Sequence, residues 1–515
     1  MEATTEQQNN KRIAKNTLLL YFRMLITMAV GLYTSRVVLQ TLGVEDFGIY
    51  NVVGGVVAMF GILNTAMAST TQRYITFSLG KGDKKELKKV FFNCVLTHFL
   101  IASIFVLLAE IIGLWLLNNK LVIPADRLSA AFWVFQCSVL STFIMIISIP
   151  YNADIVAHEK MSAFAYISIV EVFLKLAIVW ILCISPIDKL CLYAILLAAV
   201  QLGIRFIYGI YCRRHFNETH LQFQWDKKLF KEMLSFAGWN LFGGLSNILY
   251  TQGLNILLNI FFGPAVNAAR GVSVQIQNVV TQFSNSFQMA INPQITKSYA
   301  NKDLKQMHAL VFSSSKFTIL LLLILTTPFF VNSEFILSIW LKNVPEWSPI
   351  FVQIMLCIVI VDAAANPFMI SSAATGNIRF YQVVIGGTML LIVPSAYVLL
   401  RLGCSPYIVF LTHLFYCLLT FVIRLFIVRK MISFKILDYI RKSLLRSILA
   451  ILLTVGIVGF FKNIPAESTA RTVLILGGSL CVAVAACYFA GLSTTERCFV
   501  NEKVKKYLGR FLCSK

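Results

Sequence analysis

The sequence predicts an all-α integral membrane protein with fourteen transmembrane helices. Of its 515 residues, 58% are hydrophobic and 13% are charged, whereas a typical soluble domain carries about 25% charged residues. Apolar runs of about 20 residues, the length that a helix needs to cross ~30 Å of hydrocarbon, recur along the whole chain. This composition excludes an ordinary soluble enzyme, a set of nucleic-acid-binding domains and a disordered chain.

The predicted spans follow one another with short links, none of which is long enough for a folded domain. Each span is a continuous apolar run with few charged residues. The fourteen spans are 14–36, 47–69, 90–117, 130–150, 162–184, 190–212, 233–260, 267–293, 309–332, 348–370, 381–400, 406–428, 445–462 and 471–491.

Lysine and arginine are concentrated on one side of the predicted helices. The loops on the side of the N-terminus carry about three times as many basic residues as the loops on the other side. Because cytoplasmic loops are enriched in Lys and Arg, both termini are expected to be cytoplasmic, and topology accounts for most of the net charge of +22. The first helix is expected to be an uncleaved signal anchor. The basic clusters are expected to touch anionic lipid headgroups.

Motifs of enzymatic chemistry do not appear in the sequence. There is no GxxxxGK[ST] phosphate-binding loop, no constellation of paired carboxylates, histidines and a nucleophile, and no CxxC pair among the 12 cysteines. The protein is therefore expected to be a non-enzyme without a metal or cofactor. Any energy input would come from a proton or sodium gradient, the membrane potential or the free energy of the substrate.

The sequence contains an internal repeat. A shift of 220 residues places Gly43 on Gly263 and Asp83 on Asp303 without a gap. The second and eighth spans then correspond, so the two six-helix halves run in the same direction, as in a parallel repeat. Two such bundles around a central cavity suit alternating access. The expected segments are 1–232 (helices 1–6), 233–428 (helices 7–12) and 429–515 (an extra helix pair and a basic cytoplasmic tail).

Helices 7 and 8 are unusually polar for membrane spans. Amide and hydroxyl side chains recur in them at spacings of three and four residues, which places each set on one helical face. Such a face is too costly to expose to lipid. It lines a water-filled cavity or, alternatively, forms hydrogen bonds within a dry bundle. The positions concerned are Asn240, Asn247 and Thr251 in helix 7 and Asn278, Gln282, Asn285, Gln288 and Asn292 in helix 8.

Ionisable residues inside the spans each cost about 2.5–3.5 kcal/mol at a helix centre and therefore need a reason. Glu171 and Lys175 are four residues apart and can form an ion pair, and Lys316 is close enough to a helix end to snorkel. Basic residues outnumber acidic ones at this depth, which favours an anionic substrate gripped by arginine. The cationic candidates are Arg23, Arg205 and Arg270, and the acidic candidates for ion pairing or ion coupling are Glu110, Glu171 and Asp362.

One stretch resembles a known family. Residues 42–50 read Leu-Gly-Val-Glu-Asp-Phe-Gly-Ile-Tyr, which is similar to the pattern LG-x-x-x-[FY]-G-x-[FY] of bacterial polysaccharide-export proteins. A polar cluster containing Arg73 ends the second helix, as in that family. The chain resembles the Wzx-type lipid-linked oligosaccharide flippases of the multidrug/oligosaccharidyl-lipid/polysaccharide (MOP, MATE-like) exporter superfamily. The fourteen spans and the two six-helix halves agree with that resemblance.

The resemblance implies a substrate and a site. The substrate would be an undecaprenyl-pyrophosphate-linked repeat unit of O-antigen or capsule, flipped from the cytoplasmic to the periplasmic leaflet of a bacterial inner membrane. The polysaccharide polymerase and chain-length proteins would be partners. Related flippases place arginines of helices 1, 2 and 8 in a cationic cavity, and the matching positions here are Arg23, Arg73 and Arg270.

Three alternatives remain open at this stage. A cation-coupled multidrug exporter of the same superfamily usually has an acidic residue in helix 1, whereas residues 13–44 contain no Asp or Glu. A lipid II flippase would share the cavity chemistry. A membrane-embedded polysaccharide enzyme would need a large periplasmic loop, and the predicted outer loops are short. Coupling to H⁺, to Na⁺ or to the membrane potential is also left open.

Overall fold

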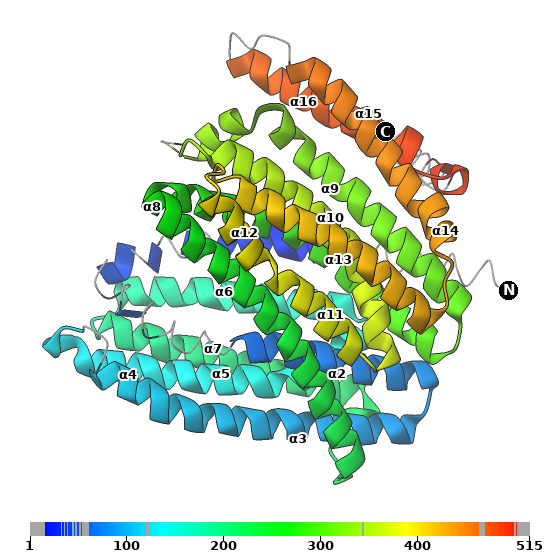
Figure 1. The fold of residues 1–515 in the computed structure, drawn as a ribbon. Helices are drawn as coiled ribbons and strands as arrows, with labels where there is room; N and C mark the ends of the chain where they lie inside the picture. Colours follow the sequence, from blue (N-terminus) through cyan, green and yellow to red (C-terminus); the bar gives the residue numbers. More distant parts are fainter. Residues whose placement is uncertain are drawn as a thin grey trace, which may run out of the picture. The chain divides into compact units, whose positions relative to one another are not determined.

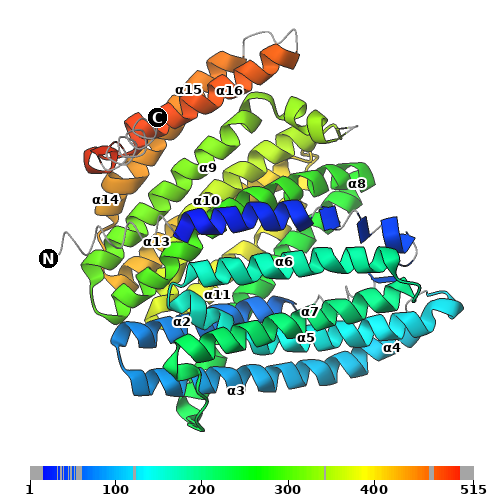
Figure 2. The ribbon, with the colours of Figure 1, turned by 180° about the vertical axis from the view of Figure 1, so that it is seen from behind.

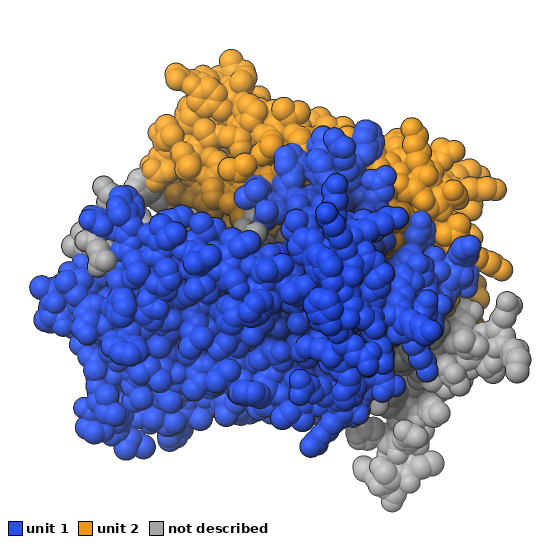
Figure 3. All heavy atoms as spheres, turned by 90° about the horizontal axis from the view of Figure 1, so that it is seen from below, with its two compact units in different colours: residues 1–245, 289–303, 376–383 blue, residues 246–288, 304–375, 384–515 orange. Residues whose placement is uncertain are grey.

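The computed structural model describes residues 16–31, most of 33–53, 61–119, 123–341, 344–462, 469–498 and Asn501. Every regular element in these ranges is a helix (Figures 1 and 2). The described residues form two compact units, which Figure 3 distinguishes by colour. Each unit is described by itself below.

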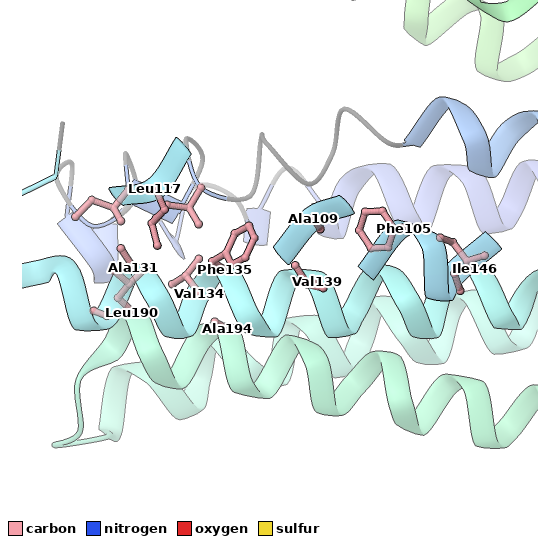
Figure 4. Packing of buried hydrophobic residues seen from close by; sticks show 14 of the residues in the cluster. Phe105, Ala109, Leu117, Ala131, Val134, Phe135, Val139, Ile146, Leu190 and Ala194 are labelled. Atoms are coloured by element: carbon pink, nitrogen blue, oxygen red, sulfur yellow. The ribbon is translucent and has the colours of Figure 1, made fainter. Parts of the chain in front are cut away.

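The first unit contains the helices of the first predicted half. α5 lies at its centre, since it packs against α2, α3 and α7. Phe105, Val134, Phe135 and Leu190 are buried together where these helices meet (Figure 4). The bounds are Asn16–Gly31, α2 Gly61–Lys81, α3 Lys84–Leu108, the π-helix η1 Ala109–Gly113, α4 Leu114–Asn119, α5 Leu128–Ala157, α6 Met161–Ile184 and α7 Lys189–His215.

The second unit is built around α10, which packs between α9 and α13. Phe351, Ile358 and Phe410 belong to its buried core. The extra helix pair lies on α9, where Leu320 and Leu323 pack against Ala450 and Cys487. The bounds are α9 Leu304–Trp340, α10 Ser348–Thr375, α11 Arg379–Leu390, α12 Ile392–Arg401, α13 Ile408–Ile432, α14 Ile436–Tyr439, the π-helix η4 Ile440–Leu444, α15 Leu445–Lys462, α16 Thr469–Ala486 and the π-helix η5 Cys487–Gly491.

α8 (Lys227–Ala300) is a helical hairpin rather than one straight helix. Gly263 interrupts it with φ 77° and ψ −169°, a conformation that glycine adopts without the penalty of a side chain. The Arg270 guanidinium reaches back to the Thr251 carbonyl oxygen at 2.8 Å. These two residues would lie ~28 Å apart along a straight helix. The two arms therefore correspond to the predicted spans 233–260 and 267–293.

The backbone repeats with the spacing that the sequence predicts. Gly43 and Gly263, which are 220 residues apart, have φ angles of 81° and 77°. Gly82 and Lys302, again 220 residues apart, also have positive φ and precede the starts of α3 and α9. α5 and α10 begin with the same separation. The two six-helix halves therefore share their turns as well as their helix order.

In the described part of the chain, 10 helices are long and apolar enough to cross a membrane. The helix Asn16–Gly31 is apolar but shorter. α2 and the two arms of α8 correspond to further predicted spans, and their many polar side chains lower their hydropathy. α2 continues to Lys81, beyond the predicted end of the second span at residue 69. Helical hydrogen bonds extend beyond the apolar run there, and residues 54–60 of that span lie outside the described residues.

The two units divide the chain differently from the predicted segments. The first unit comprises 1–245, 289–303 and 376–383, and the second comprises 246–288, 304–375 and 384–515. Both ends of α8 thus belong to the first unit, and its hairpin tip belongs to the second. The extra pair α15–α16 joins the second unit because it packs on α9.

Candidate functional site

Arg23 belongs to the helix Asn16–Gly31, and its side chain contacts α6. Its guanidinium stacks 4.6 Å from the centre of the Phe164 ring, and Nη1 donates a long hydrogen bond of 3.5 Å to Ser168. Its buried Nε has no hydrogen-bond partner among the described residues. The Glu171 carboxylate is close enough to attract the guanidinium. Arg23 therefore keeps donor capacity that its protein surroundings do not use.

Glu171 and Lys175 form the ion pair for which their spacing is suited. The Lys175 ammonium lies 2.6 Å from Glu171 Oε1, and Gln201 of α7 donates to the same oxygen at 3.3 Å. Because Glu171 also acts on Arg23, one carboxylate serves two cations. The local balance of charge in the first unit is positive.

Two further predicted arginines lie against aromatic rings. The Arg73 guanidinium is 4.5 Å from the Tyr74 ring and 4.9 Å from the Phe77 ring. A side chain on Gly376, which has φ 85°, would collide with it. Arg205 stacks 3.9 Å from the Tyr151 ring, and its Nε has no hydrogen-bond partner within the described ranges. Stacking holds each cation without neutralising it.

One end of the first unit joins segments of both sequence halves. Glu159 is 5% exposed and accepts hydrogen bonds from Lys297 at 2.9 Å and Gln294 at 3.1 Å. Next to Lys297, the backbone of α2 comes so close to α8 that a Cβ on Gly80 would lie 2.6 Å from Ala300. Glu159, Lys297, Gln294, Gly80 and Ala300 are called the closure cluster below.

The amides of helix 7 have different partners from one another. Asn240 receives a hydrogen bond from Gln382 at 3.1 Å, and its own amide lies 3.5 Å from Thr70. Asn247 is exposed and donates to the Tyr250 hydroxyl at 3.1 Å. The Thr251 hydroxyl bonds to the Asn247 carbonyl one helical turn away. Asn240 thus has an interhelical role within the first unit, whereas Asn247 retains an accessible amide.

Arg270 is a structural residue of the hairpin in this conformation. Only 8% of its surface is exposed. Besides the bond to Thr251, its Nη1 donates to Asn255 Oδ1 at 3.2 Å. These bonds tie the second arm of α8 to the first, close to the turn at Gly263. The resemblance assigns this guanidinium to substrate binding, but here it donates its hydrogen bonds to residues of α8.

The polar face of helix 8 is divided. Asn278, Gln282 and Asn285 are exposed. Gln288 is 2% exposed and donates to the Ala363 carbonyl at 2.7 Å. The Asn292 Oδ1 is buried without a hydrogen-bond partner in the described part of the chain. The accessible part of the predicted stripe is therefore its first half.

The acidic candidates occupy separate places. Asp362 in α10 is exposed and receives a weak hydrogen bond from the Cys417 thiol at 3.6 Å, and Arg424 lies near enough to attract it. Glu110 lies in the π-helix η1 and accepts a hydrogen bond from Gln136 at 3.1 Å. A π-turn often marks a functional position, and the local sequence gives no signal for it.

One cluster has no counterpart among the candidates that the sequence predicts. The His158 Nε2 lies 2.6 Å from Glu218 and 3.7 Å from Asp154. The ligand atoms of the three residues lie within 4.8 Å of one another, an arrangement that could hold a metal ion. Burial raises the pKa of Glu218, but hydrogen bonds from His158 and the backbone outweigh it, so this pKa lies below its ordinary value. Asp154 and His158 are four residues apart, whereas the distant Glu218 could be found only in three dimensions.

The comparisons with known proteins agree with the helical architecture. An outward-facing multidrug resistance MATE family transporter of the MOP superfamily aligns with a TM-score of 0.68 at 14% identity, over 82% of this chain and 96% of the other. A MOP superfamily transporter from Pyrococcus furiosus, described as having a binding pocket of reverse polarity, aligns with a TM-score of 0.63 at 14% identity and the same coverage.

Sequence comparison gives a curated relative and a family. An uncharacterized membrane protein of Bacillus subtilis (strain 168), EpsK, is 18% identical over 294 residues. The match covers 55% of this chain and 56% of the relative, so the chain spans little more than half the length of that protein. The pattern of the family described as polysaccharide biosynthesis protein (Polysacc_synt) matches residues 13–297. The solved structures with which this fold aligns are transporters. The chain is a multi-pass membrane protein that belongs to the polysaccharide biosynthesis protein family and has the fold of the MOP superfamily transporters.

Proposed function

We propose that the protein is a flippase for undecaprenyl-pyrophosphate-linked oligosaccharide repeat units. It would carry them from the cytoplasmic to the periplasmic leaflet of a bacterial inner membrane during synthesis of O-antigen or capsule. The proposal rests on the surroundings of Arg23. This arginine is a cation within a predicted span. Among the described residues its buried Nε has no hydrogen-bond partner, and only part of one carboxylate balances its charge.

Cations of this kind suit the pyrophosphate of a lipid-linked substrate. Arg23 and Arg205 are both stacked on aromatic rings, and each has an Nε without a partner among the described residues. A guanidinium grips phosphate oxygens with two parallel hydrogen bonds. Organic cations, which a multidrug exporter carries, would be repelled by the same charges.

The exposed amides of α8 suit the saccharide. Asn278, Gln282 and Asn285 lie on one helical face and are accessible. Lipid offers amides no hydrogen-bond partners, so this face requires water or a polar ligand. Sugar hydroxyls both donate and accept hydrogen bonds, as amides do. The prenyl tail would stay in the lipid while the polar head passes.

The closure cluster supports a cycle of alternating access. It lies at the end of the first unit that the distribution of basic residues predicts to be cytoplasmic. Glu159, Lys297 and the close contact at Gly80 hold segments of both sequence halves together. Substrate entry from the cytoplasmic leaflet requires these contacts to separate. Glu159 is buried, so the attraction within its ion pair is largely offset by lost hydration. Exchange of this pair for water on opening therefore costs little net free energy, which suits a reversible gate.

The membrane potential would drive the step. The cell interior is negative, so outward movement of an anionic head gains about 2.3 kcal/mol per charge per 100 mV. Coupling to H⁺ or Na⁺ through Asp362 or Glu171 is an addition to this scheme, and the exposure of Asp362 within α10 is the observation that favours it.

Deletion of the gene in its host tests the proposal. Surface polysaccharide and the leaflet distribution of prenyl-linked repeat units would be measured, with wild-type and Arg23→Ala chains supplied from a plasmid. We expect loss of surface polymer and accumulation of lipid-linked units in the cytoplasmic leaflet, restored only by the wild type. Normal polysaccharide together with new sensitivity to cationic dyes would instead assign the protein to multidrug export.

A further inference from the structure

A pocket of about 480 Å³ lies within the second unit. One wall is the first part of α9. The other is the segment from Lys435 through α14 and η4 into α15, with Ser493 and Glu496 completing the rim. The volume is in the range of small-ligand sites. The basic residues that line it are Lys305, Lys316, Lys435, Lys442 and Arg446.

Among the described residues, one of these five cations has an ion-pair partner. Lys316, expected from the sequence to snorkel, is instead 4% exposed and donates to both carboxylate oxygens of Glu496 at 2.6 and 2.7 Å. The Ser493 N–H fixes the same carboxylate at 2.7 Å. The other four basic residues make no ion pair within the described ranges, and Asp438 is the one further acidic residue in the lining. The pocket therefore carries a surplus of positive charge.

Buried hydrogen bonds hold the two walls in place. The Tyr439 and Ser315 hydroxyls lie 2.8 Å apart, and Tyr439 is fully buried. Ser443 donates to the Phe312 carbonyl at 2.9 Å. The His308 Nε2 lies 2.8 Å from the Ile432 carbonyl oxygen. A site whose walls are fixed before a ligand arrives loses less conformational entropy on binding.

The π-helix η4 lies in the middle of the second wall and carries Lys442. A π-turn inserts an extra residue into a helix and often occurs at functional sites. Here Lys435, Lys442 and Arg446 line the same pocket from before, within and after that turn. The wide turn is thus part of the arrangement that brings three cations to one wall.

We propose that this pocket binds a phosphate-bearing anion. Four cations on two fixed walls have no ion-pair partner in the described ranges, and they match a phosphate group, which accepts several charge-assisted hydrogen bonds. The surroundings favour the headgroup of an anionic phospholipid over a soluble phosphate. Leu437 and Leu445, on the segment that forms the second wall, are 56% and 49% exposed and would accommodate acyl chains. The inference goes beyond the flippase proposal and does not depend on the transported substrate.

The test uses the purified full-length chain. Wild type, Lys435→Gln/Lys442→Gln and the matched control Lys430→Gln/Arg441→Gln would be reconstituted in nanodiscs of phosphatidylcholine alone or of equimolar phosphatidylcholine and phosphatidylglycerol. The control removes the same charge from neighbouring exposed positions outside the pocket lining. Native mass spectrometry would count the phosphatidylglycerol that stays bound. A second arm would add inorganic pyrophosphate to the phosphatidylcholine samples and record the shift in melting temperature.

The two arms distinguish the sources of phosphate. Retention of phosphatidylglycerol that falls about 30-fold in the pocket variant alone, the size expected for two lysines at an anionic headgroup, supports the lipid. A pyrophosphate shift that disappears in the pocket variant alone supports a soluble phosphate. Equal behaviour of the pocket and control variants in both arms overturns the proposal. None of these readouts measures flipping, so they stand apart from the test of the proposed function.

Discussion

Arg23 in the first unit and Arg270 in the second are both arginines in predicted spans, and the same resemblance assigns both to substrate. Their surroundings differ. Arg270 donates two hydrogen bonds that hold the arms of α8 together. Arg23 has one long hydrogen bond, a stacked ring and a buried Nε without a described partner. An arginine in a membrane span is therefore a candidate for substrate binding when the protein leaves some of its donors unused, and its presence in the span is not enough.

Replacement of Arg270 is expected to have the largest effect and tests whether this arginine is structural. Arg270→Ala should lower the stability of the folded protein by about 3 kcal/mol or more, because two hydrogen bonds from a charged donor are lost near the hairpin turn. Yield and melting temperature of the detergent-solubilised protein would be measured. Arg270→Lys should recover part of the loss. A stable, abundant Arg270→Ala protein that has lost only transport would place Arg270 with Arg23.

Arg23→Ala should have the opposite signature. We expect transport to fall about tenfold or more, since one charge-assisted contact with the substrate disappears, while protein level and melting temperature stay near those of the wild type. The readout is surface polysaccharide normalised to the amount of protein in the membrane. A parallel fall of protein and activity would make Arg23 a structural residue like Arg270.

The ion pair between Glu171 and Lys175, beside Arg23, can be tested in the same way. Glu171→Gln leaves Lys175 and Arg23 without their shared carboxylate, and Lys175→Met leaves Glu171 facing Arg23 alone. The double variant should therefore be less destabilised than the sum of the two, with a coupling of about 1 kcal/mol. Melting temperatures of the four proteins give this value. Strict additivity would mean that the 2.6 Å contact contributes nothing.

A third buried cation, Lys316, differs from both arginines because its partner titrates. Burial raises the pKa of Glu496, but the Lys316 and Ser493 hydrogen bonds and the Lys316 charge lower it more, so this pKa lies below the ordinary value of 4.5. The stabilisation by the pair is thus fully present above pH 4.5 and is lost as the pH falls through the lower folded-state pKa. Melting temperature recorded from neutral pH downward should show a component that Glu496→Gln abolishes. Identical profiles would show that the pair does not contribute.

Much of the fold could be predicted from the sequence. Apolar run lengths located the helices, and the 220-residue shift located turns that share positive φ angles at Gly43 and Gly263. The end of α2 at Lys81 was less predictable, since its polar residues form helical hydrogen bonds but give no hydropathy signal. The site was less predictable. Spacing suited Glu171 to Lys175, but no local pattern connects Lys316 with Glu496 or His158 with Glu218.

The amino-acid sequence alone predicts a helical membrane protein with two parallel halves and an excess of cations at membrane depth. These properties follow from composition, run length and periodicity, which act locally along the chain. Which polar groups form hydrogen bonds within the protein, and which remain available to a ligand, depends on the tertiary structure. Gln288 donates to the carbonyl of Ala363 in α10, and Arg270 donates to the carbonyl of Thr251 in the other arm of α8. Asn285 is exposed, and Arg23 has a buried Nε without a partner among the described residues. The reason is physical, because a buried donor is satisfied by whatever acceptor the fold brings to it.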